Sequence, residues 1–401
     1  MRPLVVYLDS SDYSTLSDPR WRSDAIDAIR AELLELAKSP FVRFAFSGAH
    51  LSEMAPLEAK YATAATARAD LLVALCGRNA LISFDRLLKS ELAYFANPDD
   101  TPVQILSENA DWFPEIDDAI SPIQWADTAH EIDTASKERG LNREQRRSLK
   151  RKLFKSNQPK TPMREWLAQH DAGADLTDIL RLYPMRPQDA KVLGRFVVGQ
   201  ATATEAQRAF LESLRDPRWM MRWFAAHHDK LTPVTEWLRS PSRSMLVNMR
   251  EIAAGAKELR RLDAIHGVGI KSEMLTSTAW QASQDAVLLG VANQLRIQFH
   301  PGTALIPAVE QVDRHCPGLS TTIRSLHSAL WDSVGANPRP PQESDFIDAV
   351  HAMYAPYVSV FRADRYMSPH VQKQVACRGS QVVSRLDTLP SQIQGMLHRS
   401  M

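Results

Sequence analysis

The sequence predicts an α/β protein with a parallel sheet flanked by helices, interrupted by a large all-helical insertion. Near both ends of the 401-residue chain, short apolar runs rich in β-branched and aromatic residues alternate with segments of helical periodicity. That alternation is typical of a sheet covered by helices. Between the ends, helical periodicity continues with almost no strand signal. We therefore expect an α/β domain formed by residues 1–98 and 337–401, and an inserted helical lobe at residues 99–336.

The N-terminal part contains three predicted strands, at residues 4–8, 41–46 and 80–84. The first is a continuous apolar run, which is typical of a buried strand in a parallel sheet. Helices are predicted over residues 22–38, around Glu53 and over residues 60–77, and Pro40 ends the first of them. The order of strand, helix, strand and helix favours an α/β sheet.

The C-terminal part begins after residues 337–341, a proline-rich connector that favours an extended backbone. Beyond it we predict a helix at residues 343–355, a strand at 357–361, a helix at 366–375 and an edge strand at 381–383. Within the insertion, residues 99–125 are predicted as a linker or irregular segment. Further helices are predicted over residues 205–240, 244–265 and 279–296, with the tryptophans of the first packing between inserted helices.

Composition narrows the functional classes. The net charge is +1, so any surface for nucleic acid must be local. The three cysteines form no metal-ligand spacing, and their sparse, odd count fits a reducing compartment. The N-terminal apolar run is too short for a signal peptide, and no apolar stretch of membrane-spanning length occurs. We expect a cytoplasmic protein, and we find no motif of a serine hydrolase, zinc peptidase or dinucleotide-binding enzyme.

Acidic residues occur where a doubly wound sheet binds ligands, beyond the carboxyl ends of its strands. Asp9 ends the first predicted strand, Asp364 follows the strand at 357–361, and Glu53 lies on the helix after the second strand. Asp345 and Asp348 are three residues apart on one helix face. Carboxylates brought together repel one another, and a hard divalent cation removes that repulsion. The sequence thus predicts a Mg²⁺ or Mn²⁺ site with Asp9, Asp348 and Asp364 as ligands, and with Glu53 and Asp345 as further ligands or as bases that orient a water.

Each acid also has a structural interpretation. Asp9 can simply cap the next helix, Glu53 can be a solvated helix residue, and Asp345 can be a first-turn acid. Asp364 can pair with a neighbouring arginine. The joint pattern favours a site, because every acid falls at a compatible position. Other polar residues could assist or could serve only in turns, caps or solvated faces: Ser10, Ser11, Ser47, His351, Arg362 and Arg365.

These residues resemble the PIN-domain family of nucleases. Asp9 in VVYLDSSDYS is similar to the family's Asp at the end of the first strand, and Glu53 in SGAHLSEM to its Glu on an early helix. Asp348 in SDFIDAVHA, with Asp345 just before it, and Asp364 in VSVFRADRYM are similar to the later acids. The resemblance covers residues 1–96 and 342–390. It implies a parallel sheet with helices on both faces and metal-dependent endoribonuclease activity, whereas the large helical insertion departs from minimal members.

The insertion contains a strongly basic segment at residues 137–160, which is the best candidate in the chain for contacting nucleic-acid phosphates. A solvated charged face is the alternative. The residues expected to bind the substrate are Arg143, Arg146, Arg147, Lys150, Arg151, Lys152 and Lys155. Our main hypothesis is a nuclease that cuts RNA or single-stranded nucleic acid, with a protein partner or inhibitor left open. The alternatives are a non-catalytic protein- or RNA-binding module and a DNA-directed nuclease.

Overall fold

The computed structural model describes residues 3–56, 58–97, 103–116, 125–155, 158–161, 165, 184–197, 199–227, scattered positions from 250 to 265, 277–334 and 339–400. The chain divides into two compact units. The first comprises Met1–Glu115 and Val234–Met401, and the second comprises Ile116–Pro233. The N- and C-terminal segments therefore fold together in the first unit, which carries the sheet.

The main sheet has four strands in the order β2-β1-β7-β8, and every neighbouring pair is parallel. Its strands are β1 (Leu4–Tyr7), β2 (Val42–Ala45), β7 (Val360–Arg362) and β8 (Gln381–Val383). In the register of the central strand, Val6 pairs with Phe44 on one side and Val360 on the other. The predicted α/β fold with a parallel sheet is confirmed. The strand predicted at 357–361 starts later, because Pro356 lies in a 3-10 turn at Ala355–Tyr357.

The third predicted strand is only a short edge element. β3 (Ala80–Leu81) pairs antiparallel with β4 (Leu106–Ser107), and a single parallel bridge from Ala80 to Phe46 joins it to the main sheet. The segment around β4 is not a linker, because Ile105, Trp112 and Phe113 are buried. A Cβ atom at Gly48 would lie 3.1 Å from a ring carbon of Trp112, so this close approach favours glycine.

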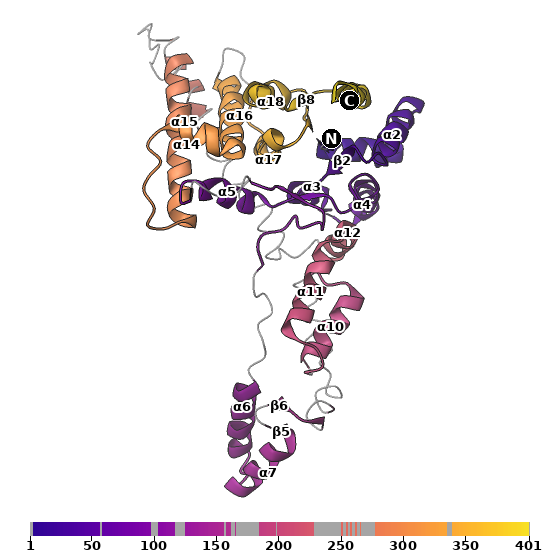
Figure 1. The fold of residues 1–401 in the computed structure, drawn as a ribbon, viewed down its shortest axis with the longest axis vertical. Coiled ribbons are helices and arrows are strands. Elements are labelled where there is room, and N and C mark those ends of the chain that lie inside the picture. The colour runs from indigo at the N-terminus through magenta and orange to yellow at the C-terminus, as the bar shows by residue number, and fades with distance from the viewer. Residues whose placement is uncertain are drawn as a thin grey trace. The chain divides into compact units, whose positions relative to one another are not determined.

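Helices cover the sheet in the first unit (Figure 1). The predictions of helices over 22–38, around Glu53, over 60–77, 343–355 and 366–375 are confirmed. Local signals set their ends: Ser23 caps α2 through the amide of Ile26, and Gly77, with φ +57°, ends α4. These helices are α1 (Ser10–Ser17), α2 (Asp24–Leu36), α3 (Gly48–Met54), α4 (Ala62–Cys76), α5 (Phe84–Ala93), α17 (Glu343–Ala352), α18 (Met367–Val375) and α19 (Leu389–Ser400).

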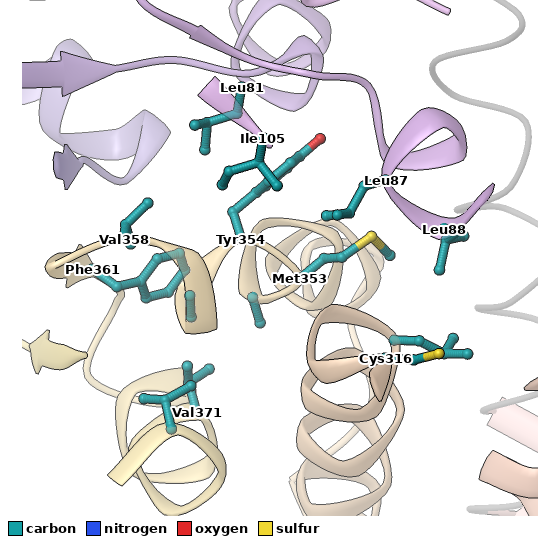
Figure 2. Packing of buried hydrophobic residues seen from close by; sticks show 14 of the residues in the cluster. Leu81, Leu87, Leu88, Ile105, Cys316, Met353, Tyr354, Val358, Phe361 and Val371 are labelled. Carbon is teal, nitrogen blue, oxygen red and sulfur yellow. The ribbon is translucent and has the colours of Figure 1, made fainter. Parts of the chain in front are cut away.

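Three helices from the sequence range assigned to the insertion pack within the first unit. They are α14 (Ser277–Phe299), α15 (Val309–His315) and α16 (Pro317–Val334). The reason is burial, since Leu288 of α14 and Leu319 of α16 share one apolar cluster with Leu87 and Met353. Figure 2 shows Leu87 and Met353 in this cluster, together with Cys316 just before α16. The start of α16 is also fixed by Glu91, whose buried carboxylate accepts hydrogen bonds from the amides of Gly318 and Leu319.

The second unit is mainly helical, as predicted for this part of the chain. It contains α6 (Trp125–Glu138), α7 (Arg143–Leu153), α10 (Pro187–Val197), α11 (Ala203–Leu214) and α12 (Pro217–Ala226), with a short pairing of β5 (Phe154–Lys155) and β6 (Gln158–Pro159). Trp223 is buried, whereas Trp237 and most of the helix predicted at 244–265 lie outside the described residues. Among the described helices, none combines the length and the apolar character that crossing a membrane requires.

Candidate active site

The carboxyl edge of the sheet gathers acids around Asp348. Asp9 follows β1, Asp364 follows β7, and these two strands are neighbours. Glu53 lies on α3, directly after β2 on the other side of β1. Ligands of open α/β sheets bind at this edge, at the point where the strand order reverses. Here that point is at β1, which lies between β2 and β7. Elements from the two ends of the sequence therefore meet at one place.

Asp348 on α17 is the centre of this group. Burial raises the pKa of its carboxyl group well above the usual range, and the negative charges of Asp9 and Glu53 raise it further, followed by those of Asp364 and Asp345. Within the described residues, the Asp348 carboxylate has no hydrogen-bond or ion-pair partner. A half-buried carboxylate in this position needs a proton or a cation.

Glu53 is held by a buried hydrogen-bond chain that starts at Ser47. The Tyr7 hydroxyl lies 2.6 Å from the Ser47 hydroxyl and 2.6 Å from Nδ1 of His351, and Nε2 of His351 lies 2.8 Å from the Glu53 carboxylate. Because a carboxylate can only accept, Nε2–H of His351 donates to Glu53. Nδ1 of the neutral ring then accepts from the Tyr7 hydroxyl. Burial opposes ionisation of Glu53, but the hydrogen bonds from His351 and Ser10 outweigh it and lower its pKa. Glu53 is thus an oriented carboxylate.

His50 helps to hold the same hydrogen-bond chain in place. Its Nε2–H donates to the Leu8 carbonyl at 2.9 Å, and its Nδ1 accepts from the Ser47 amide at 3.0 Å. Burial, and then the neighbouring His351, lower the pKa of His50 well below its usual value, so the ring is neutral. Sequence reasoning missed both His50 and Tyr7. A tyrosine inside a buried strand was the one available signal, because its hydroxyl requires a partner.

Asp9 caps α1, and Asp364 accepts a hydrogen bond from the first amide of α18. An oxygen of Asp9 accepts from the Ser11 amide at 2.7 Å, and Oδ1 of Asp364 accepts from the Met367 amide at 2.6 Å. Both side chains are half-buried. Capping therefore accounts for part of their bonding, and it also fixes the two carboxylates at the sheet edge beside Asp348.

Asp345 is placed differently from the other acids. Its side chain is 2% exposed, and its two oxygens receive one hydrogen bond each from the Arg339 guanidinium at 2.9 Å. One of these oxygens also accepts from the Gln342 amide at 2.8 Å. Because Arg339 and this cap occupy the carboxylate, Asp345 anchors the start of α17. It influences Asp348 through its charge.

The remaining predicted polar residues divide into internal partners and exposed groups. Arg362 is buried and pairs with Asp12 at 3.1 Å, so it does not face a substrate. Burial raises the pKa of Asp12 to about 7, against the opposing effect of Arg362. Ser10 and Ser47 belong to the interior, near Glu53 and Tyr7 respectively, whereas Arg365 and Ser11 are exposed.

Most of the predicted basic residues lie on α7 in the second unit, and Lys155 lies in β5 directly after it. Asn142 caps this helix by accepting from the amides of Glu144 and Gln145. Arg146 is half-buried and pairs with Asp133 at 2.6 Å. The other six predicted phosphate-binding residues are exposed: Arg143, Arg147, Lys150, Arg151, Lys152 and Lys155. α7 therefore presents a cationic surface.

The acids are near one another without forming a closed metal cage. In the described ranges, no group of three or more Asp, Glu, His or Cys side chains is arranged so that it could hold a metal ion by itself. Any cation here would have to keep water or substrate oxygens among its ligands, as Mg²⁺ commonly does.

Comparison of the chain with protein-family models, with curated proteins and with solved structures gives no match.

Proposed function

We propose that this protein is a Mg²⁺- or Mn²⁺-dependent endonuclease of the PIN-like type, most directly a ribonuclease. The observation that carries the proposal is the half-buried Asp348 carboxylate, which lacks a partner in the described chain and is surrounded by the charges of Asp9, Glu53 and Asp364. The parallel sheet with acids beyond its carboxyl edge supports the same conclusion.

The donor set fits a hard cation that retains water. Asp348 supplies an available carboxylate, and Asp9 and Asp364 supply half-buried carboxylates that their helix amides hold in place. Mg²⁺ is usually held by one or two carboxylates together with waters and phosphate oxygens. When bound, the cation would activate a water and stabilise the charge that develops on the phosphodiester.

Glu53 is the residue best suited to orient the attacking water. Its carboxylate is an acceptor, and the hydrogen bond from His351 fixes its direction. Tyr7 in turn holds the His351 ring, so the orientation of Glu53 depends on a buried and rigid set of groups. We assign Asp345 a positioning role, because Arg339 occupies its oxygens.

The test is cleavage of labelled single-stranded RNA and DNA of the same sequence, in Mn²⁺ and in EDTA. We expect cutting that requires the metal, and a loss of about 100-fold or more in Asp348→Asn. Asp387→Asn is a matched control, because Asp387 is an exposed acid that pairs with Arg385. Cutting that survives EDTA, or that is equal in Asp348→Asn and wild type, contradicts the proposal.

A second function is favoured by one observation, the lack of a closed metal cage in the described part of the chain. In that case the α/β unit is a scaffold, and the protein binds RNA or protein without catalysis. Binding of RNA without cutting under both metals would support this module. Preferential cutting of the DNA strand would instead identify a DNA-directed nuclease.

A further inference from the structure

A pocket lies among α14, α16 and the C-terminal part of α18, in the unit that carries the sheet. Its volume is about 390 Å³, and its wall is both aromatic and polar. The lining includes Trp280, Gln281, Arg324, Trp331, Lys373 and Gln374. It also includes Asp285, whose carboxylate is paired with Arg324. None of them belongs to the acidic group around Asp348.

The aromatic wall is a cluster of rings that are tilted against one another. The Trp280 ring lies 4.3 Å from the His327 ring and 5.1 Å from the Trp331 ring, measured between centroids. The indole N–H of Trp280 donates to the His327 carbonyl at 3.2 Å, which locks its position. Among the described rings, Trp331 contacts only Trp280, and it is half-buried. Trp331 therefore offers a ring face on which a planar ligand can stack.

The polar wall has one compensated cation and one available cation. Arg324 is held by Asp313 at 2.7 Å and by Asp285 at 2.8 Å, so its charge is already balanced. Lys373 is exposed and forms no ion pair with any described residue. It can therefore bind a phosphate group.

The amides of Gln281 and Gln374 line the same pocket, and within the described chain neither has a hydrogen-bond partner. Each amide offers both donors and an acceptor. Together with an aromatic face, such groups match the flat ring and polar edge of a nucleobase.

α18 connects this pocket with the acidic group. Asp364 caps its first turn through the Met367 amide, and Lys373 lies in its last turn. The helix has 9 residues, which corresponds to about 13 Å. His370 fixes α18 against α16, because its ring contacts Ser328 at 2.9 Å and Asp332 at 3.3 Å. The distance between the pocket and the acidic group is therefore set by α18, which is held rigidly against α16.

We propose that this pocket binds one unstacked base of a single-stranded nucleic acid, with Trp331 stacking on the base and Lys373 contacting an adjacent phosphate. The inference rests on the proposed nuclease function for the identity of the strand, and it adds a base subsite at a fixed distance from the acids. The basic helix α7 lacks aromatic side chains for this purpose, and the pocket supplies them.

The test is fluorescence anisotropy with end-labelled oligouridylate and oligodeoxythymidylate in EDTA, where metal-dependent cutting does not occur. Stacking on one aromatic side chain predicts that Trp331→Ala weakens binding by about 5- to 150-fold, with a smaller loss in Trp331→Phe. Lys373→Ala should reduce the salt dependence of binding by about one phosphate contact. Trp21→Ala is the matched control for tryptophan, because Trp21 is 62% exposed outside the pocket.

Affinities equal to wild type in Trp331→Ala and Lys373→Ala overturn the base subsite, as does a wild-type protein that binds neither strand. Unfolding curves check that the variants are folded, and Trp331→Phe keeps a large ring where alanine destabilises the protein. The nuclease proposal is tested separately by cutting in Mn²⁺. Binding that depends on Trp331 without any cutting supports the base subsite and contradicts the nuclease proposal. Cutting by a protein whose binding does not depend on Trp331 supports the nuclease proposal and contradicts the base subsite.

Discussion

Tyr7→Phe removes one hydroxyl from the centre of the buried hydrogen-bond chain and leaves the aromatic ring in place. That hydroxyl is 2.6 Å from both the Ser47 hydroxyl and Nδ1 of His351, and both partners are buried. Leaving a buried polar group without a partner costs about 1–3 kcal/mol. Tyr7→Phe leaves two such groups, the Ser47 hydroxyl and Nδ1 of His351, and small shifts of the neighbouring side chains recover part of the loss. We therefore expect the free energy of unfolding to fall by about 2–4 kcal/mol.

Tyr13→Phe is the matched control, because Tyr13 is also fully buried, but among the described residues its hydroxyl contacts only the Cys76 thiol, at 3.4 Å. A weak bond of this kind should cost below about 1 kcal/mol. Urea unfolding followed by circular dichroism gives both values by linear extrapolation. Nuclease activity should also fall in Tyr7→Phe, since His351 loses the partner that fixes its ring. Equal destabilisation in the two variants would refute the assignment of Tyr7 as the holder of His351.

Three further predictions concern the rest of the molecule. A methyl group at Gly318 would lie 2.8 Å from a buried carbonyl oxygen and from the Glu91 carboxylate, so Gly318→Ala should destabilise the protein by about 1–3 kcal/mol in urea unfolding; unchanged stability would contradict this close packing. Burial raises the pKa of Glu91 from 4.5 to about 7, so the folded state holds a proton that the unfolded chain releases. The free energy of unfolding should therefore fall, on the order of 2–3 kcal/mol, as the pH rises through this window, and Glu91→Gln should lose that component; an identical pH profile in the variant would count against it. Replacing the exposed Arg147, Lys150 and Arg151 by alanine should flatten the salt dependence of RNA binding by about 2 in log–log slope, measured by anisotropy, whereas an unchanged slope would mean that α7 does not contact phosphates.

The sequence was sufficient for features that depend on local patterns. Continuous apolar runs located β1 and β2, and helical periodicity located α2, α4 and α17. The position of acids directly after predicted strands also indicated where they meet, because parallel strands bring their carboxyl ends to one edge of the sheet. Asp9, Glu53 and Asp364 lie near enough to Asp348 that their charges raise its pKa.

Features that depend on distant contacts were not predictable from the sequence. Residues 99–125 were predicted as a linker or irregular segment. The part from 103 to 116 is mostly irregular, but Trp112 is buried against Gly48, and no local pattern indicates that burial. α14 and α16 join the sheet unit through apolar faces that resemble those of any bundled helix. The hydrogen bond from His351 to Glu53 spans most of the chain, and no local pattern indicates it. Asp345 looked like a ligand because the position of Arg339 could not be known.

The most direct measurement of the central claim is Mn²⁺ binding, followed by electron paramagnetic resonance, in wild type and in Asp348→Asn. We expect that wild type binds one or two ions and that the asparagine variant loses most of this affinity, while Asp387→Asn retains it. Wild-type protein that takes up no Mn²⁺, or an Asp348→Asn variant that binds it equally well, would contradict the claim that these converging carboxylates serve a cation.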